Sequence, residues 1–171
     1  MRAQLATVLQ GRWAQPLQLQ APLPVHLQLV DAQGLFNLRN LLREGRPDSV
    51  AVASFVQLCT AQGLGRGECE AAVTYLQARL RDDSWSAQAP LPREDALQLA
   101  LAGANATAVQ ALVQRTVMLP AHTLLNANTS DASIVAATVG SVEPARLQAL
   151  LGERDRGAGS STAATSPTAC T

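Results

Sequence analysis

The sequence predicts an α+β domain that is predominantly helical, in which a β-hairpin packs on a helical hairpin and short helices follow. Alternating apolar and polar residues from residue 25 indicate a strand, and apolar residues at helical spacing between residues 48 and 81 indicate two helices. Shorter helical patterns recur from residue 93 to residue 151. Of the 171 residues, 47% are hydrophobic and 3% aromatic, so the chain can bury one core, built mainly from aliphatic side chains.

The N-terminal part of the chain is expected to be an arm followed by a β-hairpin. Residues 1–24 should be extended or flexible, because their prolines disfavour helix. A module over residues 25–81 then begins with the alternating strand. Residues 31–34, DAQG, have the composition of a turn, including a glycine that can take positive φ. Residues 35–42 are favoured as the returning strand, although their leucines also fit one face of a helix.

Two helices joined by a glycine-rich turn should complete this module and pack antiparallel. Asp48 can cap the first helix, which should run from Ser49 to about Gln62. Gly63 suits the position just after its end. The second helix is expected over residues 68–81. The apolar stripes that should face each other contain Val52, Phe55, Leu58 and Cys59 on the first helix and Cys69, Ala72, Val73, Leu76 and Leu80 on the second.

Residues 82–92 have the composition of a linker, and residues 93–151 should form a small helical region. Its helices are expected at residues 93–102, 106–117, 131–139 and 143–151. The stretch SIVAATVG, residues 133–140, could instead be a buried strand, since it is rich in β-branched residues. Residues 152–171 are small, polar and rich in Ser and Thr, so we expect a disordered tail.

Charge and composition exclude several classes of function. Thirteen acidic residues balance thirteen basic ones, all arginine, so a Schiff-base lysine or a P-loop lysine is excluded. A net charge of zero gives no field that would attract nucleic acid. No apolar run approaches the roughly 18 residues that a membrane span needs. We therefore expect neither a nucleic-acid partner nor a membrane span.

The start of the chain, MRAQLATVLQGRW, leaves the compartment open. Its apolar part is short and broken by Gln4 and Gln10, which argues against a secretory signal. The first acidic residue is Asp31, as in a transit peptide, but the segment lacks serine. The sequence favours a cytoplasmic protein over an organellar one.

Cys59 and Cys69 flank the turn between the two helices and admit several interpretations. Their C-x9-C spacing is not that of a zinc site, and the acidic neighbours Glu68 and Glu70 oppose a reactive thiolate. Free cysteines are often buried, so we favour two thiols that pack the hairpin. A disulfide is the alternative, because the last turn of one helix meets the first turn of the next; it would persist in an oxidising compartment.

No motif supplies a catalytic, cofactor-binding or metal-ligating constellation, and we expect no cofactor. His26 and His122 lie far apart, with no acid or cysteine at a recognisable spacing. The acidic pair at residues 94–95 falls in the first turn of an expected helix, where negative charge is stabilising. Two glycosylation sequons, residues 105–107 (NAT) and 128–130 (NTS), carry meaning only if the chain enters the secretory pathway.

Two stretches show resemblances. The turn Arg43-Glu44-Gly45, followed by Phe55, Cys59, Leu64 and Cys69 in the pattern F-x3-C-x4-L-x4-C, resembles small modules found beside glycosyltransferase, methyltransferase or sulfotransferase domains in algal and protist multidomain proteins. That resemblance covers about a third of the chain, implies an accessory role and carries over no catalytic residue. Residues 95–113 are similar to an ankyrin helix pair, but the T-P-L-H start is replaced by DALQ.

The favoured function is a non-catalytic accessory module that binds a protein partner through an apolar helical surface. The candidate interaction face comprises the few large rings near the linker and one neighbouring leucine: Phe55, Tyr75, Trp85 and Leu91. The alternative is that these side chains simply close the core. A rival function is a fragment or accessory region of a glycosyl- or methyl-transferase-type enzyme, with residues 133–140 as the first strand of a nucleotide-binding fold. A third is an organellar subunit of a larger assembly.

Overall fold

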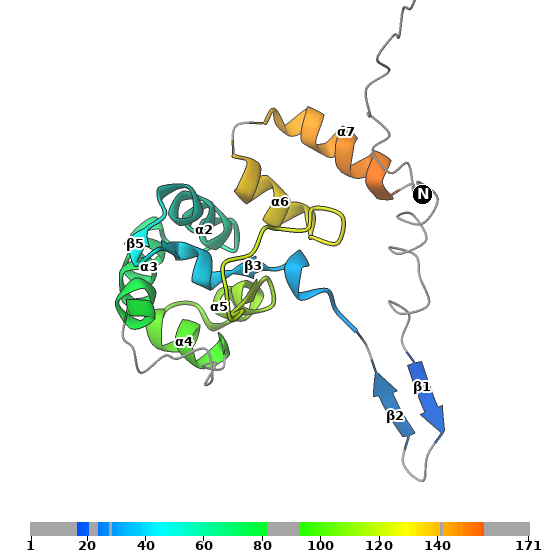
Figure 1. Ribbon diagram of the computed structural model, residues 1–171, viewed down its shortest axis with the longest axis horizontal. Helices are drawn as coiled ribbons and strands as arrows, with labels where there is room; N and C mark the ends of the chain where they lie inside the picture. Colours follow the sequence, from blue (N-terminus) through cyan, green and yellow to red (C-terminus); the bar gives the residue numbers. More distant parts are fainter. Residues whose placement is uncertain (1–16, 21–23, 28, 82–92, 141, 156–171) are drawn as a thin grey trace, which may run out of the picture. The chain divides into compact units, whose positions relative to one another are not determined.

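The structure, a computed structural model, describes residues 17–20, 24–27, 29–81, 93–140 and 142–155. The chain divides into two compact units, one of residues 30–142 and one that joins the residues up to 29 with those from 143 onward. The described elements are mostly helices with a few very short strands (Figure 1), which confirms the predominantly helical α+β class. The expected linker, residues 82–92, and the tail beyond residue 155 lie outside the described residues.

The N-terminal hairpin pairs different residues from those expected. β1 (Leu17–Gln20) and β2 (Pro24–Leu27) are antiparallel, with Leu17 opposite Leu27. The strand expected near residue 25 is therefore present, but its partner is the preceding segment and not residues 35–42. Alternation identifies a strand without identifying its partner, because the same alternation also occurs in β1.

The same unit contains α7 (Pro144–Asp155), which is longer than expected. The sequence predicted an end at Gly152, but the helix continues through this glycine, which does not have a positive φ. A glycine inside a helix costs only about 1 kcal/mol relative to alanine, so it does not by itself end a helix.

The helical hairpin forms within the other unit as expected. α2 (Ser49–Ala61) begins at Asp48, whose carboxylate accepts hydrogen bonds from two backbone N–H groups of the first turn. α3 (Arg66–Arg81) begins two residues earlier than expected. The reason is that the Glu68 carboxylate reaches back to the Gly65 N–H at 2.7 Å, as in a capping box.

The core of residues 30–142 lies between this hairpin and the shorter helices. The rings of Phe36 and Phe55 pack with their centroids 5.9 Å apart. The helices α4 (Arg93–Ala100), α5 (Ala106–Val113) and α6 (Ala132–Val139) each add a side chain to it. The largest fully buried apolar side chains are Leu38, Leu41, Phe55, Leu58, Leu76, Leu97, Leu112 and Ile134.

Two of these short helices bear on the sequence predictions: α5 is shorter than expected, and α6 decides between helix and strand for residues 133–140. α5 ends at Val113, four residues early, because β6 (Thr116–Val117) pairs in parallel with β3 (Phe36–Asn37). Residues 133–140 form most of α6 and its C-cap, so the strand alternative is wrong. The transferase-type rival thereby loses the strand on which it depended.

Residues 31–47 contain no returning strand of the expected length. They form two 3₁₀ turns, η2 (Ala32–Gly34) and η3 (Leu38–Leu41), and a small ribbon of β4 (Leu42–Arg43) with β5 (Arg46–Pro47). The ribbon's two-residue loop, residues 44–45, has positive φ at both positions, as a type I′ turn requires.

Asparagine side chains hold this irregular backbone against a distant loop. Asn37 is buried. Its side-chain amide donates to the Ala121 carbonyl at 2.8 Å and to the Thr123 hydroxyl at 3.0 Å. Its side-chain oxygen accepts a hydrogen bond from the Leu119 N–H. Asn40 pairs with the backbone N–H and carbonyl of Thr123, at 3.1 and 2.7 Å. These bonds satisfy backbone groups that a regular strand would otherwise pair, so the segment needs no second strand.

The first 3₁₀ turn rests on the loop of residues 126–130. The Asp31 carboxylate accepts from the Thr129 hydroxyl at 2.7 Å and from the Asn126 amide at 2.8 Å. A Cβ on Gly34 would lie 2.9 Å from the Thr129 carbonyl oxygen. Gly34 is therefore required by this close approach, and not by the positive φ expected from the sequence.

Candidate functional site

The predicted interaction face is not assembled by the described residues. The side chain of Phe55, on α2, is completely buried in the core, so it cannot contact a partner. Tyr75 is partly buried and packs against the core from α3. Trp85 and Leu91 lie outside the described residues. The alternative that ring side chains close the core holds for Phe55, because Phe36 supplies an aromatic neighbour that the sequence analysis did not pair with it.

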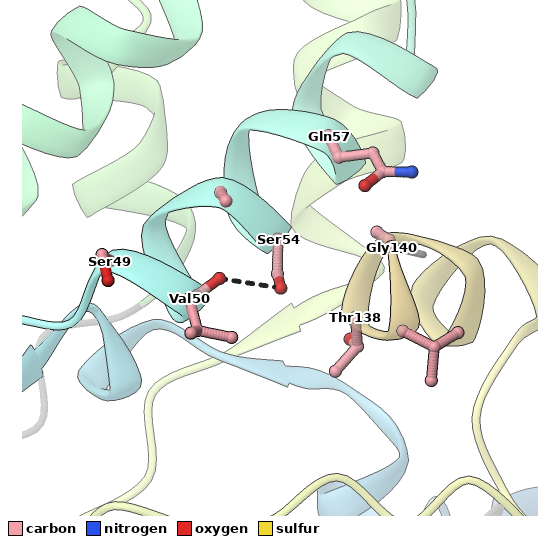
Figure 2. A pocket seen from close by; sticks show the side chains of 9 residues that line it. Ser49, Val50, Ser54, Gln57, Thr138 and Gly140 are labelled. Atoms are coloured by element: carbon pink, nitrogen blue, oxygen red, sulfur yellow. Dashed lines mark hydrogen bonds between the residues drawn. The ribbon is translucent and has the colours of Figure 1, made fainter. Parts of the chain in front are cut away.

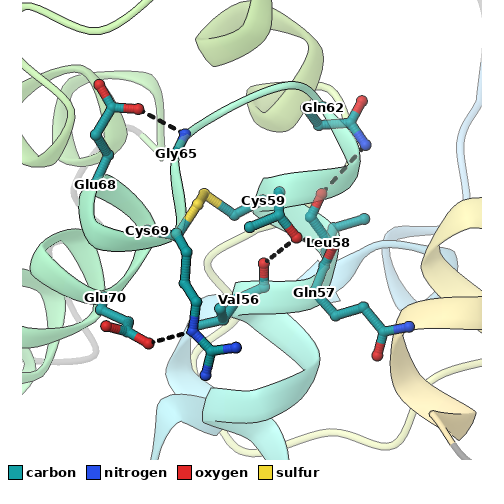
Figure 3. The surroundings of a disulfide bond; sticks show 11 residues. Val56, Gln57, Leu58, Cys59, Gln62, Gly65, Glu68, Cys69 and Glu70 are labelled. Carbon is teal, nitrogen blue, oxygen red and sulfur yellow. Dashed lines mark hydrogen bonds and ion pairs between the residues drawn. A yellow bond between two sulfur atoms is a disulfide. The ribbon is translucent and has the colours of Figure 1, made fainter.

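Cys59 and Cys69 are joined in a disulfide, and the favoured interpretation as free thiols therefore does not hold. The bond links the end of α2 to the first turns of α3, with the two Cα atoms 5.9 Å apart (Figure 3). Both residues are completely buried. A thiolate from solvent cannot reach either sulfur in the folded chain, so the bond serves as a structural link and not as an exchange centre.

The remaining predicted candidates stay apart. His122 is exposed, with its Nε2 3.4 Å from an Arg43 nitrogen, and His26 lies in β2. Within the described ranges, no three His, Cys, Asp or Glu side chains gather as a metal site would require. Nor does any helix of the described residues combine the length and apolarity needed to cross a bilayer.

A shallow groove lies between α2 and the last turn of α6. It has a volume of about 320 Å³. Figure 2 shows the side chains that line it. Asp48 starts α2 and Asp131 starts α6, each through its carboxylate, and Gly140, with φ 44°, ends α6 beside the groove. The lining residues are Ser49, Val50, Ala53, Ser54, Gln57, Ala137, Thr138, Val139 and Gly140.

The polar groups within the groove are neutral and are mostly engaged in their own helices. The Ser54 hydroxyl donates to the Val50 carbonyl at 2.9 Å, and the Thr138 hydroxyl donates to the Ile134 carbonyl at 2.8 Å. Figure 2 shows the first of these bonds, with Thr138 and Gly140 on the opposite wall. No base lies beside either hydroxyl among the nine lining residues. A hydroxyl needs an adjacent base to act as a nucleophile, and these two hydroxyls instead donate to backbone carbonyls of their own helices.

Two aliphatic side chains stand exposed at the edges of the groove. Val50 is 70% exposed and Val139 is 39% exposed. Sequence reasoning missed Val50 because it followed the buried stripe of α2. The signal was present, however: Val50 is an apolar residue that lies off that stripe, at a position where a surface helix usually carries a polar residue.

No protein-family model matches this chain, and no curated protein matches it at a significant level.

Proposed function

We propose that this chain is a non-catalytic protein-interaction module whose groove between α2 and α6 receives a short, uncharged, apolar segment of a partner protein. The observation that carries the proposal is the pair of exposed valines, Val50 and Val139, on either side of a groove floored by small residues. Contact with an apolar partner side chain would remove both valines from water, at about 25 cal/mol per Å² of buried apolar surface.

The size of the groove limits what it can hold. A volume of about 320 Å³ lies at the low end of the range for small-molecule sites. One or two aliphatic side chains of a peptide fit this volume. The resemblance of the module at residues 25–80 to transferase-associated domains is compatible with an accessory role, but the groove supports the proposal independently.

The chemistry of the lining selects against charge. None of its nine residues is ionisable, so a charged partner group would lose hydration without gaining an ion pair. Gln57 is exposed at the rim and offers one amide donor and acceptor set, which fits the backbone of an extended or helical peptide. The partner segment should therefore be apolar, with its specificity set by shape and by one or two backbone hydrogen bonds.

A site-specific photo-crosslink in the source cells would test the proposal. A photoreactive amino acid at position 50 of the full chain should capture a partner peptide rich in uncharged aliphatic residues, and the same probe at Ala71, exposed on α3, should not. Val50→Glu should abolish the complex while preserving the fold, because negative charge suits the first turn of a helix. Ala71→Glu adds the same charge away from the groove and should leave binding unchanged.

Two results would overturn the proposal. One is a complex that survives Val50→Glu, since the partner would then bind elsewhere. The other is recovery of the chain with a bound nucleotide or sugar nucleotide and no captured peptide, which would favour the transferase-type alternative. The organellar-subunit alternative depends on the first thirty residues, most of which lie outside the described part of the chain, and stays a prediction.

A further inference from the structure

The two glycosylation sequons take on meaning once the disulfide is known. Both acceptor asparagines, Asn105 and Asn128, are exposed in the folded chain. Asn105 lies in the turn between α4 and α5, and Asn128 lies in the turn of the loop that follows β6. An N-linked glycan is bulky and must project from a surface, so the fold leaves room for one at each position.

The disulfide indicates the compartment. Disulfides are rare in the reducing cytosol, and those that occur there usually serve exchange or redox sensing. The Cys59–Cys69 bond is unsuited to that role because both residues are fully buried. Forming it removes two electrons and two protons from the thiols, which the disulfide of a thiol oxidoreductase takes up in an oxidising compartment. The buried disulfide therefore favours an oxidising compartment over the cytoplasm, which was expected from the first residues of the chain alone.

We propose that this chain matures in the secretory pathway and carries an N-linked glycan on at least one of Asn105 and Asn128. The donor would be an oligosaccharide linked to a lipid pyrophosphate. Transfer forms a bond between the first sugar carbon and the asparagine Nδ2, breaks the bond from that carbon to the pyrophosphate oxygen, and releases the lipid pyrophosphate and one amide proton.

The geometry at each site is compatible with a glycan and shows when it must be added. The Asn105 oxygen accepts from the Ala108 N–H at 3.1 Å, so the cap of α5 uses the oxygen and leaves Nδ2 for the sugar. At the second site, Ser130 is 2% exposed and its hydroxyl donates to the Asn126 carbonyl at 2.8 Å. The transferring enzyme must therefore recognise this hydroxyl before the loop folds, while the chain is being synthesised.

The test uses the full chain, recovered from its source cells with an epitope tag. Its intact mass should fall on treatment with a peptide N-glycosidase, and peptide mapping should place the glycan at Asn105, Asn128 or both. Asn105→Asp removes the first acceptor while keeping a capping oxygen, and Asn128→Gln removes the second at an exposed turn. Thr107→Ser keeps the first sequon and is the matched control. Alkylation under denaturing, non-reducing conditions should leave Cys59 and Cys69 unlabelled.

Glycan at either asparagine that disappears in the corresponding variant supports the proposal. A wild-type mass that the glycosidase leaves unchanged overturns it, whatever the state of the cysteines. A glycosidase-sensitive mass that persists when both asparagines are replaced also overturns it, because the modification would then lie elsewhere. Neither result bears on the groove, so this inference and the proposed function can fail separately.

Discussion

The helical hairpin of residues 48–81 and the irregular stretch of residues 31–43 both contribute to the core of the same unit, yet they differ in what fixes their backbone. The hairpin is held by facing apolar stripes and by one disulfide. The irregular stretch also buries Phe36, Leu38 and Leu41, but its backbone is fixed by side-chain amides and a carboxylate that bond to residues about 80 to 98 positions later in the chain. We call residues 31–43 the clamped stretch.

The difference shows what each kind of interaction specifies. Apolar burial is non-directional, so a hairpin tolerates small changes of helix length or rotation. Hydrogen bonds to buried asparagines are directional, and each one fixes a particular carbonyl or N–H of the distant loop. We therefore expect changes in the hairpin to lower the stability of the whole unit, and changes in the clamped stretch to loosen one loop first.

The largest effect should come from truncating the centre of the hairpin core. Phe55→Ala leaves a cavity beside Phe36 and should cost about 3–5 kcal/mol of unfolding free energy. Urea unfolding followed by circular dichroism would measure it. Leu124→Ala is the control, because that leucine is 83% exposed and its truncation should stay within about 0.5 kcal/mol. A Phe55→Ala loss below about 1 kcal/mol would show that the Phe36–Phe55 contact does not organise the core.

Removing the covalent link should cost somewhat less. The double variant Cys59→Ala and Cys69→Ala opens a loop with a sequence separation of 10, and the chain-entropy model gives a loss of about 3 kcal/mol for a loop of that length. Thermal unfolding of wild type and variant, both with Cys170 alkylated, would measure the difference. If equal melting temperatures were found, the hairpin would be held by its apolar stripes alone.

The clamped stretch should be most sensitive at Asn37. Asn37→Ala leaves the Ala121 carbonyl, the Thr123 hydroxyl and the Leu119 N–H without this partner. We expect it to lower the free energy of unfolding by about 2–3 kcal/mol. Hydrogen exchange should accelerate in residues 118–125 before it does in α2 and α3. Gln98→Ala, which truncates an exposed amide on α4, serves as the control. Uniform acceleration across the unit would remove the distinction between the two regions.

These two regions also differ in how far the sequence could predict them. The cap at Asp48 and the stripes of the hairpin were predicted because each depends on neighbours within about four residues. Within the clamped stretch, residues 35–42 were wrongly predicted as one returning strand, because Asn37 finds its partners some 80 residues away and no local pattern records that distance.

The groove shows the same limit in a milder form. Its helices were predicted, and Val50 could be recognised as an apolar residue off the core stripe. The end of α6 lies across the groove from Val50 because α2 packs against α6, and these two elements are about 80 residues apart in the sequence. Sequence periodicity gives the face of a helix but not the element that packs beside it.

The smallest predicted effect concerns pH and the other anchor of the clamped stretch. The hydrogen bond from the Thr129 hydroxyl, with those from the Gln33 N–H and the Asn126 amide, lowers the pKa of Asp31 below its ordinary value of 3.8, although desolvation opposes them. A carboxyl whose pKa is lowered by folding stabilises the fold above its ordinary pKa and loses that contribution as the pH falls through its folded value.

Asp31→Asn should therefore lower the free energy of unfolding by about 1 kcal/mol at pH 7 and at pH 5. Below about pH 4 this difference in unfolding free energy from wild type should shrink. Urea unfolding of both proteins across this range would measure it, and using the difference cancels the titration of the other carboxylates. A difference that grew on acidification would mean that the Asp31 carboxyl is protonated in the fold. Asp31 would then hold the 126–130 loop by donating a proton and not by accepting hydrogen bonds as a carboxylate. The account of how this end of the clamped stretch is held would then be wrong.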